Sequence, residues 1–115
     1  METKVDIARI VDSPFCVAID DGNIVHDRIA TLLTEGKTAV VSFVGVKRLT
    51  TAFLNAAIGQ LYNEYSADQI RLGLRVTEAS QDQLRLIKRV VDNAKKFFAD
   101  PRRGEQVIRD LNGEE

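Results

Sequence analysis

The sequence lacks the residues on which several classes of small protein depend. Its 115 residues include one cysteine, one histidine and no tryptophan. One cysteine excludes an internal disulfide and a cysteine metal cluster, and one histidine excludes a metal site built on two histidines. We therefore expect no metal and no cofactor. Cys16 lies in an apolar run, FCVAI, and we expect it to be a buried strand residue.

Long apolar runs and a net charge are also missing. Sixteen basic and seventeen acidic residues give a formal net charge of −1, so the overall charge gives no reason to expect nucleic-acid binding. No apolar run approaches the ~18 residues that span a membrane. The first residues carry charges where a signal peptide has an apolar block. These features predict a soluble cytoplasmic protein without a membrane association.

The length and composition fit one globular domain. The chain is 44% hydrophobic and 29% charged, which is typical of a protein that buries its own core. After residues 100 and 101, an Asp-Pro pair, the sequence becomes short and polar. We expect a domain over residues 1–100 and a polar C-terminal tail over residues 101–115.

Apolar patterns in the first half of the chain predict a strand-rich start. Two apolar runs, residues 4–11 and 14–19, flank a turn-forming Asp-Ser-Pro and predict an N-terminal β-hairpin. Apolar residues at helical spacing predict a helix over residues 20–35, which Gly36 ends. The continuous apolar run at residues 38–46 predicts a central strand that is covered on both faces.

The second half predicts two more helices and one more strand. A helix begins near Thr51, and residues 70–76 alternate as in a half-buried strand. Ser80 and Gln83 form a capping box that opens a helix to about Phe98. The predicted order is β-β-α-β-α-β-α, an α/β sandwich with a mixed, mostly parallel sheet and the N-terminal hairpin.

The middle helix has one ordinary apolar side and one side without charge. Its apolar side consists of Phe53, Leu54, Ala57, Ile58, Leu61 and Tyr65. Its other side consists of Ala52, Asn55, Ala56, Gly59, Gln60 and Asn63. Exposed helices normally use charged residues, whereas a small neutral face suits a protein partner. The alternative is that this side packs against the first or third helix of the same chain.

Two threonines stand at the start of this helix. A hydroxyl at that place caps the first turn, which explains one of Thr50 and Thr51. The other is a candidate for phosphorylation, since a phosphate adds about −1.5 to −2 charge near the positive helix end. Alternatively, Lys47, Arg48 and the helix start form a site for an anion or a small ligand. The spacing is not that of a nucleotide-binding P-loop.

Residues 41–62, VSFVGVKRLTTAFLNAAIGQLY, resemble the STAS-like family of uncharacterised bacterial proteins, which are relatives of the sulphate transporter and anti-sigma factor antagonist domain. The resemblance extends from about Asp20 to Phe98. It is most specific at Phe43, Gly45, Val46, Thr50, Phe53, Leu54 and Asn55. Ser42 and Leu49 stand where better-studied antagonists commonly have aspartates, and Ala52 replaces a glycine or serine.

The resemblance implies a fold and a function. STAS domains are α/β sandwiches in which the loop and helix matching residues 49–65 bind a partner such as an anti-sigma factor kinase. A serine at the helix start is phosphorylated to break that complex, and the position that matches it here is Thr51, with Thr50 beside it. A kinase-like ATPase or another signalling protein is the implied partner.

We therefore expect a regulatory interaction module and not an enzyme. The predicted docking residues are Lys47, Arg48, Thr50, Thr51, Ala52, Asn55, Ala56, Gly59 and Asn63. A small-ligand or anion-binding protein that uses the Lys47 to Thr51 loop is the alternative, and a homodimer through the bare helix is a third possibility. A basic face on the last helix has no interleaved aromatic residues, so we do not expect it to bind nucleic acid.

Overall fold

The computed structural model describes residues 1–99. Its strands are β1 (Glu2–Asp6), β2 (Phe15–Cys16), β3 (Thr38–Ser42), β4 (Arg48–Leu49) and β5 (Leu74–Thr77). Its helices are α1 (Ile7–Val11), α2 (Ile19–Thr34), α3 (Thr51–Leu54), the π-helical η1 (Asn55–Gly59), α4 (Leu61–Glu64), α5 (Ala67–Gly73) and α6 (Gln81–Ala99). The predicted tail at residues 101–115 lies outside the described residues.

The strands form one three-stranded sheet in the order β1-β3-β5 and a separate two-stranded sheet of β2 and β4. Each pair within residues 1–99 is parallel. The predicted central strand is therefore confirmed in its place as β3. The inward row of the main sheet contains Val5 and Val41, both fully buried. The outward row places Lys4, Val40 and Arg75 side by side.

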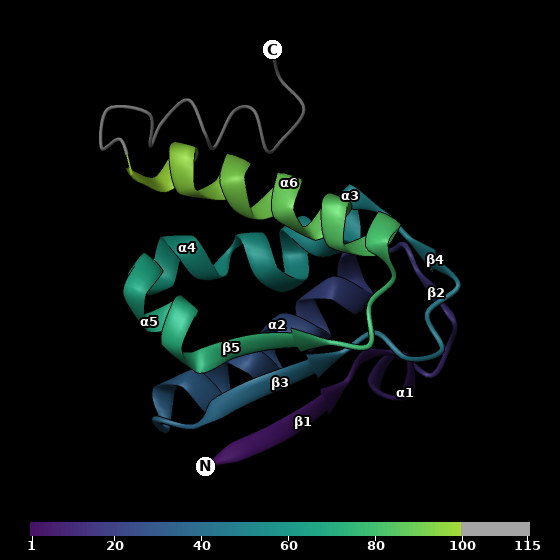
Figure 1. Cartoon of the computed structure of the whole chain (residues 1–115), viewed down its shortest axis with the longest axis horizontal. Helices are drawn as coiled ribbons and strands as arrows, with labels where there is room; N and C mark the ends of the chain where they lie inside the picture. The colour runs from purple at the N-terminus through teal and green to yellow at the C-terminus, as the bar shows by residue number, and fades with distance from the viewer. Residues whose placement is uncertain (100–115) are drawn as a thin grey trace.

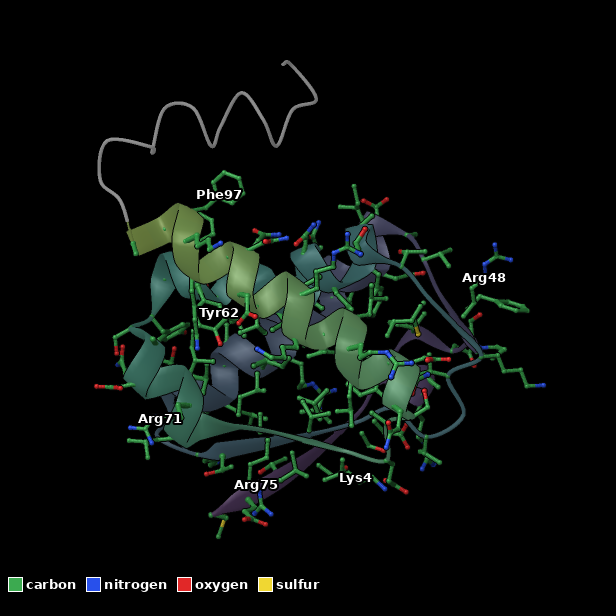
Figure 2. All side chains as sticks on the ribbon, turned by 45° about the horizontal axis from the view of Figure 1, so that its top comes forward. Lys4, Arg48, Tyr62, Arg71, Arg75 and Phe97 are labelled. Atoms are coloured by element: carbon green, nitrogen blue, oxygen red, sulfur yellow. The ribbon has the colours of Figure 1, made fainter. Side chains whose placement is uncertain are left out.

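The prediction that the central strand is covered on both faces is wrong for the described residues. Val40, at the middle of the outward row, is only half-buried, and both of its neighbours in that row are exposed. Lys4 and Arg75 point away from the helices in Figure 2. Arg75 forms an ion pair with Glu2 across this face. The helices therefore cover one face of the sheet.

The helices form successive layers on the inward face. α2 lies against β1 and β3, and the segment from α3 to α4 packs on α2. α6 covers the far side of that segment, so the segment lies between two helices (Figure 1). Within residues 1–99, no helix combines the length and the apolar character needed to cross a membrane.

The predicted N-terminal hairpin is wrong. β1 ends at Asp6, and the residues that follow form the short helix α1. Ile7, Ile10 and Val11 have the i, i+3, i+4 spacing of a helix, and all three contact the core. Asp12 then takes a left-handed conformation with φ 61°. β2 pairs with β4 in parallel and not with β1, so the order β-β-α-β-α-β-α is not reproduced.

The predicted strand over residues 70–76 is wrong in its first half. α5 extends to Gly73, and only β5, at the end of the predicted range, is a strand. A capping box starts α5, because the Ser66 hydroxyl accepts from the Gln69 N–H at 3.1 Å and the Ser66 N–H donates to Gln69 Oε1 at 2.8 Å. The equivalent predicted box at the start of α6 is confirmed.

Cys16 is fully buried, as predicted. Its burial, with a smaller contribution from the charge of Asp21, raises the pKa of the thiol from 9.0 to about 11. The thiol of the unfolded chain therefore loses its proton first. The contribution of this thiol to the free energy of unfolding is fully present below pH 9 and is lost as the pH rises toward 11.

We expect the free energy of unfolding to fall by on the order of 1 kcal/mol between pH 8 and pH 10 through this thiol. Burial also raises the pKa of Tyr62, which acts in the same direction. Urea denaturation at both pH values should therefore compare the natural protein with Cys16→Ala. A fall of equal size in both proteins would show that the thiol does not contribute.

Candidate functional site

The predicted docking helix is a composite of three segments. We call α3, η1 and α4 together, residues 51–64, the composite helix. In its π turn, the N–H of Gln60 donates to the carbonyl of Asn55 at 3.0 Å. A π turn holds one more residue than an α-helical turn, so more residues can face the neighbouring helices here than a 3.6-residue period assigns. The four consecutive residues 56–59 are all buried.

Ala56 faces α2 at a point where the two backbones come close. Ala56 is 4% exposed. A Cβ atom added to Gly22 of α2 would lie 2.7 Å from the Cβ of Ala56 and 2.6 Å from the carbonyl oxygen of Phe53. Real Cβ atoms do not approach so closely, so the two helices touch because each has a small residue here.

Gly59 faces α6 on the opposite side. A Cβ atom added there would lie 3.6 Å from Cγ1 of Val90 and 3.3 Å from Oδ1 of Asn55. The small side of the helix is thus covered at this point by the third long helix of the same chain. The prediction that Ala56 and Gly59 contact a partner is wrong, and the alternative of packing within the chain is right for both. A second copy of the chain cannot reach these two residues either.

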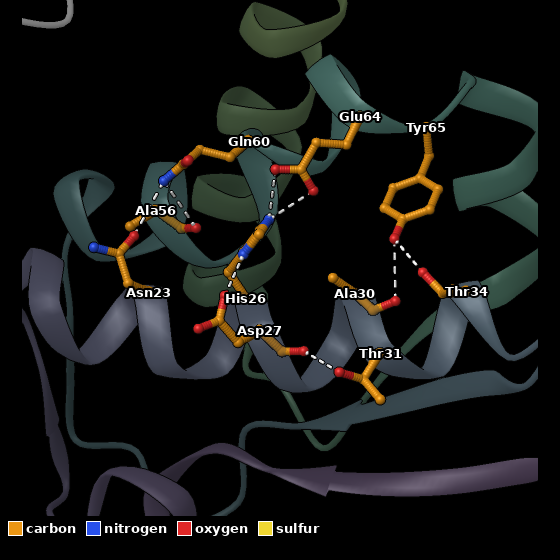
Figure 3. A network of polar contacts seen from close by, with 10 residues as sticks. All are labelled: Asn23, His26, Asp27, Ala30, Thr31, Thr34, Ala56, Gln60, Glu64 and Tyr65. Atoms are coloured by element: carbon orange, nitrogen blue, oxygen red, sulfur yellow. Dashed lines mark hydrogen bonds and ion pairs between the residues drawn. The ribbon is translucent and has the colours of Figure 1, made fainter.

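Polar contacts tie the second half of the composite helix, and Tyr65 directly after it, to α2 (Figure 3). The side-chain contacts are Gln60 with Asn23 at 3.2 Å, His26 with Glu64 at 2.9 Å, and the Tyr65 hydroxyl with the Ala30 carbonyl at 3.1 Å. His26 is 12% exposed at its side chain. These contacts fix the position of the second half of the helix against α2.

The two threonines have different roles. Thr50 is the N-cap, and its hydroxyl accepts from the Phe53 N–H at 3.2 Å and donates to the Val17 carbonyl at 3.0 Å. Thr51 is the first helical residue, it is exposed, and its hydroxyl has no hydrogen bond to any of residues 1–99. The expectation that capping explains one threonine is confirmed. Thr51 is the hydroxyl that remains free among the described contacts.

An exposed apolar strand lies beside this helix start. In β2 and the residue after it, Phe15 is 55% exposed, Cys16 is buried and Val17 is 38% exposed. Phe15 pairs in register with Arg48 of β4, and Figure 2 shows Arg48 projecting from this end of the molecule. Lys47 and Arg48 are exposed and form no ion pair with a described residue. The register therefore places the exposed apolar Phe15 beside the exposed basic Arg48 on one surface.

Part of the predicted docking set belongs to this surface. Ala52 and Asn55 are exposed near the helix start, whereas Asn63 is exposed far along the helix on α4. We call the following residues the candidate docking surface: Phe15, Val17, Lys47, Arg48, Thr51, Ala52 and Asn55. Phe15 and Val17 were missed because residues 14–19 were interpreted only as a strand of the N-terminal hairpin, without a docking role.

The loop before the helix is held by its own backbone. The N–H groups of Lys47 and Arg48 donate to the Pro14 carbonyl at 2.8 and 3.2 Å, and the N–H of Thr50 donates to the Cys16 carbonyl at 3.2 Å. These N–H groups are therefore not free to surround an anion. An anion at this loop would have to use side chains and the first helical turn.

Ser42 lies at the end of β3, where its buried hydroxyl donates to Oε1 of Glu78 at 2.7 Å. This hydrogen bond, followed by the charge of Lys4, holds the pKa of Glu78 below its usual value. The Ser42 oxygen also accepts from the Val44 N–H at 3.3 Å. Ser42 thus joins the ends of β3 and β5 and fixes the chain before the docking loop.

Residues 1–99 contain no group of three or more His, Cys, Asp or Glu side chains that could hold a metal ion. A shallow depression of about 450 Å³ lies beyond the carboxyl ends of the strands. It is lined by Asp6, Ala8, Arg9, Asp12, Ser13, Pro14, Val44 and Gly45. The predicted ligand residues Lys47, Arg48 and Thr51 do not line it.

A protein-family model described as a STAS-like domain of unknown function matches residues 21–84. The match runs from the first turn of α2 to the first turn of α6, so it includes β3, β4, the composite helix and β5. It does not include β1, α1 or β2. No curated protein and no solved structure matches the chain.

Proposed function

Because the chain belongs to the STAS-like family, we propose that it acts as a protein-interaction module and not as an enzyme. The partner lies against the candidate docking surface at the start of the composite helix. This narrows the docking surface predicted from the sequence, since Ala56 and Gly59 are buried and Thr50 is engaged within the chain.

The proposal rests mainly on the exposed Phe15 and Val17 beside Arg48. Aromatic residues and arginine are enriched in protein interfaces, and a few of them contribute most of the binding free energy. The hydrogen bond from Thr50 to the Val17 carbonyl joins this apolar strand to the helix start. A partner with apolar side chains and carboxylates complements a surface of this composition.

Thr51 is the proposed switch. A phosphate there adds about −1.5 to −2 charge, which offsets the charges of Lys47 and Arg48 close by in the sequence. The positive end of the helix stabilises the phosphate itself, so the fold is retained while the surface loses its positive charge. Phosphorylation would therefore release a partner that carries carboxylates.

Affinity capture from native cells tests the docking surface. We expect Phe15→Ser combined with Arg48→Glu to reduce the recovered partner at least about tenfold, because both changes remove interface contacts. Leu72→Ser is the matched control, since Leu72 is 69% exposed on α5. Recovery of the same partner by both variants would contradict the proposal. Circular dichroism should show that both remain folded.

The switch has its own test. We expect Thr51→Glu to weaken the partner's binding and Thr51→Val to leave it unchanged, since only the first adds charge. Isothermal titration calorimetry with the captured partner measures both. Mapping of phosphorylated residues on the native protein should then identify Thr51. Equal binding by the two variants would rule out control by charge at this position.

A further inference from the structure

The open edge of β1 presents backbone groups that no described strand uses. The strand order β1-β3-β5 places β1 at the side of the sheet, and Figure 1 shows no described strand beyond it. The Met1 carbonyl accepts from the Thr38 N–H at 2.9 Å, so it points toward β3. Backbone groups alternate in direction along a strand, which turns the N–H and C=O of Lys4 to the open side. Such an edge is a template for another strand.

A groove runs beside this edge and has a surplus of positive charge. It has a volume of about 460 Å³ and is lined by Lys4, Asp6, Arg9, Ile10 and Arg28. Arg9 comes from α1 and Arg28 from α2, and both are exposed. Neither arginine forms an ion pair or a hydrogen bond with any of residues 1–99. Two guanidinium groups without a partner therefore lie next to an open strand.

The charges favour one occupant over another copy of the same chain. A second copy that added its β1 to this edge would bring its own Arg9 and Arg28 to the same seam. Like charges placed together across an interface cost several kcal/mol. An extended segment with carboxylates would instead satisfy both arginines, and arginine binds carboxylates with strong, charge-assisted hydrogen bonds. Ile10, which packs against the core, offers an apolar contact in the same groove.

We propose that the edge of β1 binds an extended, carboxylate-bearing peptide segment of a partner protein as an added strand. Its backbone pairs with the N–H and C=O of Lys4, and its carboxylates bind Arg9 and Arg28. Strand addition of this kind draws affinity from backbone hydrogen bonds and specificity from side chains. This surface shares no residue with the candidate docking surface, so the two proposals stand or fall separately.

Selection from random dodecapeptides displayed on phage tests the proposal. The chain of 115 residues is the bait, and we expect the enriched peptides to carry two or more acidic residues among strand-forming ones. The enriched peptide is then synthesised and its binding is titrated. Arg9→Gln combined with Arg28→Gln should weaken binding at least tenfold. The control variant, Arg85→Gln combined with Arg89→Gln, removes the same number of charges from the exposed face of α6. It should change peptide binding less than twofold.

A second measurement distinguishes strand addition from attraction between charges alone. Hydrogen exchange followed by NMR should show the Lys4 amide slowed at least tenfold by saturating peptide. Three results would overturn the proposal. The first is that no enriched peptide depends on Arg9 and Arg28 for its binding. The second is that a peptide binds without protecting the Lys4 amide from exchange. The third is that light scattering shows a dimer of the chain which the double variant at Arg9 and Arg28 abolishes.

Discussion

Gly22→Ala should destabilise the protein by about 2 kcal/mol, although alanine is the better helix former. Alanine gains about 1 kcal/mol over glycine inside a helix. The new methyl group would however lie 2.6 Å from the Phe53 carbonyl oxygen and 2.7 Å from the Ala56 Cβ. Neither atom is at the end of a flexible side chain. Overpacking of this kind costs about 1–3 kcal/mol, and here we expect the upper part of that range.

Gly59→Ala is the matched control, because it adds the same methyl group to the facing helix. Its nearest neighbours are Oδ1 of Asn55 at 3.3 Å and Cγ1 of Val90 at 3.6 Å, and the Asn55 side chain is exposed and can turn. We expect stability to stay the same or to rise by up to about 1 kcal/mol. Urea denaturation of both variants measures the difference. Equal stability of Gly22→Ala and the natural protein would show that α2 and the composite helix are not in such close contact.

A double variant locates the clash. Ala56→Gly removes the Cβ atom that faces Gly22 but leaves the Phe53 carbonyl in place. We therefore expect Ala56→Gly to restore only part of the stability that Gly22→Ala loses. A double-mutant cycle measures this restored part as an interaction energy. Complete rescue would assign the whole effect to the two methyl groups.

The same close contact shows why the uncharged side of the composite helix was wrongly predicted to contact a partner at Ala56 and Gly59. The absence of charge at Ala56 and Gly59 was a correct sign that something covers them. The pattern of one helix does not say whether the cover is a partner or the same chain, because Gly22 and Val90 are more than thirty residues away. The π turn adds to the difficulty, since four consecutive residues, 56–59, are buried there, which a fixed helical period does not predict.

Local signals predicted the sheet and the helices unequally. The continuous apolar run at residues 38–46 correctly predicted a central strand, β3, although it also suggested a cover on both faces that the described residues do not show. The capping box at Ser80 predicted α6, whereas the identical spacing at Ser66 was not used. The alternation over residues 70–76 suggested a strand there instead. A serine side chain that accepts a hydrogen bond from a first-turn N–H was the better guide in both places.

The sequence predicted only part of the candidate docking surface. The helix start and its threonines follow from cap chemistry and from the resemblance to STAS-like proteins. Phe15 and Val17 do not, because an apolar run gives no sign of which side chains point outward. Among residues 1–99, β2 pairs only with β4. Cys16 faces the core, while Phe15 and Val17 on either side of it remain exposed. That pairing is a tertiary fact which no local pattern contains.

Thr50→Val should cost about 2 kcal/mol, whereas Thr51→Val should change stability by less than about 0.5 kcal/mol. Valine has nearly the shape of threonine, so both changes remove a hydroxyl and little else. At Thr50 the lost hydroxyl caps the Phe53 N–H and bonds the Val17 carbonyl. The cap contributes about 1 kcal/mol and the second bond a similar amount. At Thr51 no hydrogen bond within residues 1–99 is lost.

Urea denaturation of the two variants measures this contrast, and its result bears on the switch. A hydroxyl that holds the fold cannot be modified without loss of the cap, whereas a free hydroxyl can carry a phosphate on a folded domain. A large loss for Thr50→Val with none for Thr51→Val therefore makes Thr51 the only one of the pair suited to reversible phosphorylation. Similar losses in both variants would show that the Thr51 hydroxyl is also structural. Phosphorylation there would then unfold the helix start and with it the docking surface.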